Sequence, residues 1–79
     1  MECIKSVFIK NGRYYIITKD KYETREKFNE RSWFIINSNP KTEDEFEELI
    51  ILSRIWVNIK FNDAIYPDPV MEKIKKYIN

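Results

Sequence analysis

The sequence contains no histidine, one glycine and one cysteine among its 79 residues, and each shortage excludes a class of chemistry. Without histidine, the chain lacks the side chain that most often serves as a general acid or base near neutral pH. The single glycine, Gly12, leaves none for a glycine-rich loop that binds phosphate groups. Cys3 alone can form no internal disulfide and does not supply the ligand set of a structural zinc site. We therefore expect a protein that is not an enzyme and that binds no cofactor and no metal.

Long apolar runs are also missing, because the longest ones, such as residues 49–52, are far shorter than the ~20 residues that cross a bilayer. Glu2 lies near the start and no long apolar stretch follows it, so we expect no signal peptide and an intracellular, cytoplasmic protein. Hydrophobic residues make up 43% of the chain and charged residues 34%, as in a folded domain. The length predicts a single small globular domain over residues 1–79.

Asn11 and Gly12 separate two runs of β-branched and aromatic residues, 4–10 and 13–18. An Asn-Gly pair in that position predicts a β-hairpin, because a tight type I′ turn needs a positive φ at both central residues. The two-residue loop sets the pairing of Lys10 with Arg13, Ile9 with Tyr14, Phe8 with Tyr15 and Val7 with Ile16. Both faces of this hairpin are then apolar, so each face needs a cover of helices or of a second copy.

A first helix is predicted over residues 21–37, because Asp20 followed three residues later by Glu23 is typical of a capping box. At about 100° per residue, one face of this helix carries Tyr22, Phe28, Trp33, Ile35 and Ile36. Phe34 falls on the opposite side, among charged residues. A third strand over residues 33–36 is the alternative interpretation.

Two further helices have clear start signals. Thr42 and Glu45 form a capping box for a helix that continues to about Lys60, with four acidic residues near its positive end. Its apolar arc is about 220° wide, so this helix needs neighbours on two sides. After a loop over residues 61–67, Asp68 and Pro69 begin the last helix. Its apolar face consists of Val70, Met71, Ile74, Tyr77 and Ile78.

These elements predict an α+β fold in the order β-β-α-α-α, with an N-terminal two-stranded antiparallel hairpin packed on three helices. Twelve aromatic residues and two apolar hairpin faces exceed what one small core can bury, and surplus apolar surface of this kind marks an interface. We therefore expect a small interaction module that self-associates, as a homodimer, or binds another protein. The candidate anchors at the interface are Trp33, Phe34, Trp56 and Tyr66.

The alternative function is nucleic-acid binding by the hairpin. Residues 1–31 hold eight basic against five acidic residues, although the whole chain carries a net charge of only +1. Basic side chains could contact phosphates while the aromatic side chains between them stack on bases. The candidates for this role are Lys5, Lys10, Arg13, Lys19 and Lys21.

Several segments from residue 33 to the C-terminus resemble parts of small uncharacterised proteins of giant DNA viruses of amoebae, similar to Mimivirus. They are residues 33–35, 39–42, 45–48 and 53–60, together with Tyr66. The resemblance implies a viral origin and a role in the host cytoplasm or in the virion. It implies no catalytic or ligand-binding residues.

Overall fold

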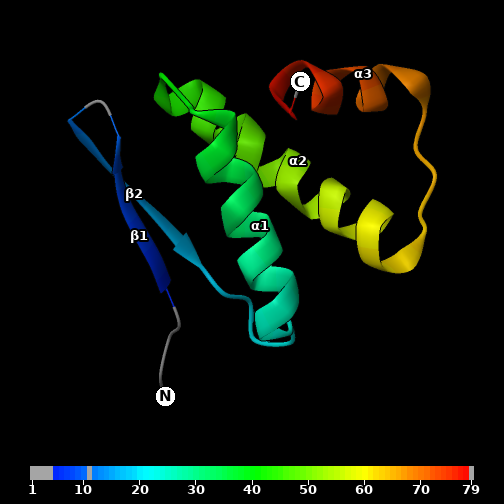
Figure 1. The fold of residues 1–79 in the computed structure, drawn as a ribbon, viewed down its shortest axis with the longest axis horizontal. Coiled ribbons are helices and arrows are strands. Elements are labelled where there is room, and N and C mark those ends of the chain that lie inside the picture. The colour runs from blue at the N-terminus through cyan, green and yellow to red at the C-terminus, as the bar shows by residue number, and fades with distance from the viewer. Residues whose placement is uncertain (1–4, 11, 79) are drawn as a thin grey trace.

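The computed structural model describes residues 5–10 and 12–78, with the side chains of Ser6, Phe8 and Lys10 left out of the description. Two strands, β1 (Lys5–Lys10) and β2 (Arg13–Thr18), are followed by three helices, α1 (Arg25–Ser38), α2 (Glu43–Asn62) and α3 (Asp68–Ile78). The predicted α+β class and element order are confirmed. Figure 1 shows the hairpin on one side of α1, with α2 and α3 on the other. Cys3 and Asn11 lie outside the described residues.

The hairpin has the predicted register, with Lys10 paired to Arg13, Ile9 to Tyr14 and Val7 to Ile16. Gly12 has a φ of 74°, the left-handed conformation that a tight turn requires. Among the described residues, the inner face of β2 is the covered one, and there Tyr15 and Ile17 are buried. The centroid of the Tyr15 ring lies 4.7 Å from that of the Phe46 ring in α2. The hairpin therefore packs against the helices through one of its two apolar faces.

Helix α1 begins four residues later than predicted. Its N-cap is Thr24, whose hydroxyl accepts a hydrogen bond from the Lys27 amide at 3.2 Å. Asp20 and Glu23 form a turn before the helix instead, in which the Glu23 amide donates to the Asp20 carbonyl. Residues 33–36 are helical, so the alternative of a third strand is wrong. The helix ends at Ser38 because Asn39 adopts a φ of 55°, a left-handed cap.

Helix α2 has the predicted N-cap, Thr42, which accepts from the Glu45 amide at 3.1 Å. The Glu45 carboxylate accepts a hydrogen bond from the amide of Lys41, the residue that precedes the N-cap, and not from the amide of Thr42 as in a standard capping box. The helix continues to Asn62, two residues further than predicted, and Asp63 caps it with a φ of 53°. Helix α2 thus extends into the segment that the sequence assigns to a loop.

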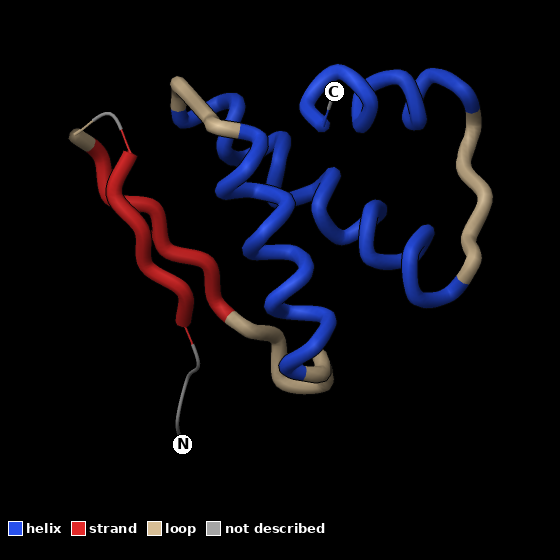
Figure 2. Tube along the Cα trace, viewed as in Figure 1, coloured by secondary structure: helices blue, strands red, loops and turns tan. Residues whose placement is uncertain are grey.

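The core lies between α1, α2 and the inner face of the hairpin, and α3 covers it at the far end (Figure 2). The fully or nearly fully buried side chains of this core are Ile17, Phe28, Phe34, Ile35, Leu49, Leu52 and Ile74. Ile74 is the buried residue of α3, as its predicted apolar face requires. Among the described residues, no helix is long and apolar enough to cross a membrane.

Candidate protein-binding site

The loop between β2 and α1, residues 19–24, is held by a buried ion pair. The Arg31 side chain, 2% exposed, donates from Nε to Glu23 Oε2 at 2.6 Å and from Nη2 to Glu23 Oε1 at 2.9 Å. Nη2 also donates to the Thr18 carbonyl at 2.9 Å, and Glu23 Oε1 accepts from the Asp20 amide at 3.1 Å. One guanidinium therefore ties the end of β2 and the loop to α1. Planar, bidentate donation of this kind is specific to arginine.

A second arginine holds the same loop from α2. Both terminal nitrogens of Arg54 donate to the carboxylate of Asp20, the longer bond being 3.2 Å. Hydrogen bonding by Arg54 holds the pKa of Asp20 below its ordinary value, and the same pair raises the pKa of Arg54. The pair is half-exposed, so its strength is limited by solvent. Together the two arginines fix the loop against two different helices.

The loop displays Tyr22, whose side chain is 91% exposed. Tyr22 lies at an open hollow of ≈ 490 Å³ between the loop, α1 and α2. The hollow is lined by Asp20, Lys21, Tyr22, Glu23, Lys27, Arg31, Arg54, Val57 and Asn58. The Lys21 ammonium lies 5.5 Å from the centre of the Tyr22 ring. An exposed aromatic side chain on a fixed loop beside a charged hollow is an arrangement suited to binding another protein.

Phe34, predicted as an exposed anchor, is completely buried, so that prediction is wrong. Its ring stacks on the Trp56 ring, with 5.6 Å between the centroids. The physical reason is that α1 is covered on two sides, by the hairpin and by α2, so its buried arc includes the side that the sequence pattern assigns to solvent. Ser32 and Arg31 are buried on the same helix.

The other three predicted anchors are placed differently from one another. Trp33 is 50% exposed on α1, whereas Trp56 is half-buried against the core. Tyr66 is half-buried after α2, and its hydroxyl accepts a hydrogen bond from Asn58 Nδ2 at 3.0 Å. The structure therefore does not bring these four aromatic residues together into one surface.

The basic residues proposed for nucleic-acid binding are also dispersed. Lys5 lies on the outer face of the hairpin, and Lys19 donates to the Asp20 carbonyl at 3.1 Å. Lys21 lies beside Tyr22, and the side chain of Lys10 is outside the described part. Arg13 lines a different hollow. Nucleic-acid binding stays a prediction.

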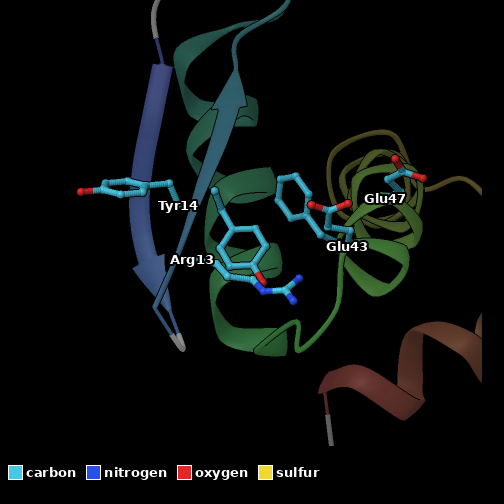
Figure 3. Close-up of a pocket in the computed structure, with 6 residues that line it drawn as sticks. Arg13, Tyr14, Glu43 and Glu47 are labelled. Carbon is cyan, nitrogen blue, oxygen red and sulfur yellow. The ribbon is translucent and has the colours of Figure 1, made fainter.

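That hollow, of ≈ 450 Å³, lies between β2 and the start of α2 and is lined by Arg13, Tyr14, Tyr15, Glu43, Phe46 and Glu47. Figure 3 shows the Arg13 side chain reaching toward Glu43, while Tyr14 points away to the opposite side of the hairpin. Acidic and basic side chains therefore share this hollow, since Glu43 and Glu47 line it together with Arg13.

The sequence pattern missed the residues that build the loop. Tyr22 was predicted on the buried face of the first helix, but it precedes that helix and is almost fully exposed. A signal for Arg31 was present, because it lies one turn from both Phe28 and Ile35 on the apolar side of α1. A charged residue in that position is buried only with a partner, which here comes from outside the helix.

Fold and loop together define a small α+β domain with an exposed aromatic side chain on a fixed loop. The model of the XTBD family, the XRN-Two Binding Domain, matches residues 17–78. The chain therefore belongs to the XTBD family, a family of protein-binding domains. No curated protein and no solved structure matches the chain. The resemblance to giant-virus proteins is tested by none of these comparisons and stays a prediction.

Proposed function

We propose that this protein is a non-enzymatic module that binds an exonuclease of the XRN2 type through the Tyr22 side chain and the hollow beside it. The observation that carries the proposal is the family match over residues 17–78, since XTBD is named as a domain that binds XRN2. The matched segment contains Tyr22, both arginines that hold its loop and every residue that lines the hollow.

The fixed loop supports a role in binding because it lowers the entropic cost of association. Ordering a mobile side chain or loop at an interface costs about 0.5–1.5 kcal/mol per side chain, and a loop held in advance avoids part of that cost. The Arg31–Glu23 pair holds the loop from α1, and the Arg54–Asp20 pair holds it from α2. Tyr22 is thus presented on a rigid support.

The chemistry of the hollow favours a partner with both apolar and polar groups. A tyrosine side chain buries about 150–250 Å² when it enters a pocket and still offers a hydroxyl for hydrogen bonding. The charged side chains around it are cationic at Lys21, Lys27, Arg31 and Arg54 and acidic at Asp20 and Glu23. Such a centre of aromatic surface with a charged rim resembles the organisation of protein interfaces.

Isothermal titration of the full chain with purified XRN2 tests the proposal. We expect Tyr22→Ala to weaken binding about 30-fold or more, which corresponds to the ~2 kcal/mol of an interface hot spot. Tyr14→Ala is the matched control, because Tyr14 is also a highly exposed tyrosine but lies outside the matched segment. An absence of binding by the parent chain, or an equal loss in both variants, would contradict the proposal.

Self-association is a second mode of binding that the sequence suggests, and a separate observation favours it. The outer face of the hairpin exposes Val7, Ile9, Tyr14 and Ile16, four large apolar side chains that no described part of the chain covers. Monomeric proteins rarely expose contiguous apolar surface of this kind.

A further inference from the structure

The outer face of the hairpin is an apolar surface with a simple, regular composition. Val7 pairs across the strands with Ile16, and Ile9 pairs with Tyr14, so the four side chains form a two-by-two patch. Their exposed fractions lie between 53% for Ile16 and 73% for Tyr14. We call these four residues the hairpin patch.

The hairpin patch lies outside the part of the chain that the XTBD family shares. The family match begins at Ile17, and all four residues of the patch precede it. Tyr22, by contrast, lies inside the match and on a different element, the loop that follows β2. The two surfaces can therefore bind independently, and what the family has in common does not account for the patch.

Charge on this face favours an apolar partner over a charged one. Alternation along the strands places Lys5 and Thr18 on the same face, paired with each other at the end remote from the turn. No acidic residue occurs in either strand. The four apolar side chains offer no charge to a strongly charged partner, and Lys5 is the one basic residue at their end. The apolar surface of a second copy matches them.

We propose that the hairpin patch is a self-association surface, on which two copies of this chain stack face to face about a two-fold axis. The proposal makes specific the self-association put forward above. Tyr14, the largest and most exposed of the four, is the anchor. When the two hairpins run in opposite directions, the Lys5 side chains lie at opposite ends of the contact and do not repel each other.

The area of the patch meets the requirement of a weak dimer. Partly exposed side chains of this number and size present on the order of 400–500 Å², so two copies bury about 1,000 Å² together with the adjoining strand backbone. This total is at the lower limit of specific interfaces. We therefore expect a reversible dimer that forms at micromolar concentrations.

Stacking also resolves a structural problem of the hairpin. An isolated two-stranded ribbon is marginally stable in water, and within residues 5–10 and 12–78 only the inner face of this one is packed on the helices. A second hairpin on the outer face places both faces of β2 in apolar surroundings, as a sheet between two layers requires.

Sedimentation velocity of the full chain, from about 1 to several hundred micromolar, tests the proposal. We expect the parent to shift from monomer to dimer as concentration rises, and Tyr14→Asp to remain monomeric, with its dissociation constant raised at least tenfold. Ile9→Lys is a second variant, so that the failure of one variant to fold does not prevent a decision. Ile51→Asp is the matched control, because Ile51 is about as exposed as Ile9 but lies on α2.

Three results of the sedimentation experiment would overturn the proposal. They are a parent that stays monomeric at every concentration, a dimer that persists in both Tyr14→Asp and Ile9→Lys, and a dimer that Ile51→Asp abolishes. Titration of Tyr14→Asp with XRN2 separates this proposal from the proposed function. Unchanged affinity for XRN2 supports two independent surfaces, whereas a loss as large as that of Tyr22→Ala would assign the patch to XRN2 and overturn self-association through it.

Discussion

Arg31→Met is expected to be among the most destabilising single substitutions in this domain. The Arg31 and Glu23 side chains are 2% and 9% exposed, so removal of the guanidinium leaves the Glu23 carboxylate buried without its counter-charge. Breaking a buried ion pair by removal of one partner costs about 3–5 kcal/mol. The variant also leaves the Thr18 carbonyl without its hydrogen bond from Arg31, at the point where β2 ends.

The magnitude can be compared with the stability of a domain of this size. At about 0.05–0.15 kcal/mol per residue, a 79-residue chain has a free energy of unfolding of about 4–12 kcal/mol. A loss of 3–5 kcal/mol is therefore a large fraction of the total. Since each kcal/mol changes the Tm of such a domain by about 4–8 °C, we expect a decrease of at least ~12 °C.

Urea denaturation followed by far-ultraviolet circular dichroism measures the loss directly. Lys60→Met is the matched control, because Lys60 pairs with Glu30 but is half-exposed, so we expect a loss below about 1 kcal/mol. The double variant Glu23→Met/Arg31→Met removes both charges and should recover part of the stability lost in Arg31→Met. An Arg31→Met protein within about 1 kcal/mol of the parent would refute this account of the loop.

Three further predictions concern the core and the acid sensitivity of the fold. Phe34→Ala removes a ring that is fully buried against Trp56 and should cost about 3–5 kcal/mol in urea denaturation; a cost below ~1 kcal/mol would show that Phe34 is not a core residue. Ser32 is buried and its hydroxyl has no hydrogen-bond partner among the described residues. Ser32→Ala should therefore increase the free energy of unfolding by about 0.5–2 kcal/mol and raise the urea midpoint. A lowered midpoint would contradict this. The hydrogen bond from Arg54 lowers the pKa of Asp20 in the folded state below its ordinary value of 3.8. The Asp20–Arg54 pair therefore stabilises the fold fully above pH 3.8, and this stabilisation is lost as the pH falls through the lowered pKa of the folded state. Asp20→Asn should therefore show a smaller loss of stability on acidification below pH ~4 than the parent, and an equal loss in both would count against the Asp20–Arg54 pair.

The elements with local signals were predictable from the sequence, and the reasons are visible in particular residues. Gly12 and the β-branched runs around it are sufficient for the hairpin and its register, because turn geometry fixes the pairing. Thr42 is a sufficient start signal for α2, because a cap acts within a few residues. Helices α2 and α3 accordingly begin at or within one residue of the predicted positions.

The candidate site depended on contacts between residues distant in sequence. Asp20 and Glu23 carry the pattern of a capping box, but Arg54 and Arg31 engage their carboxylates, and Thr24 caps the helix. The start of α1, and with it the exposure of Tyr22, therefore depends on a partner 34 residues away. Periodicity could not place Phe34 either, because the pattern alone does not show that α1 has neighbours on two sides.

Tyr15 has a practical consequence for any shortened version of this protein. The family alignment starts two positions after Tyr15, whose ring covers Phe46 and whose hydroxyl reaches the Pro40 carbonyl. A fragment that begins at the family boundary would expose Phe46 on α2 to solvent. It would also place the buried Ile17 at the N-terminus, outside a strand pair. Fragments that begin at Ile17 should aggregate and be poorly soluble on expression, whereas fragments that keep the whole N-terminal hairpin should be soluble.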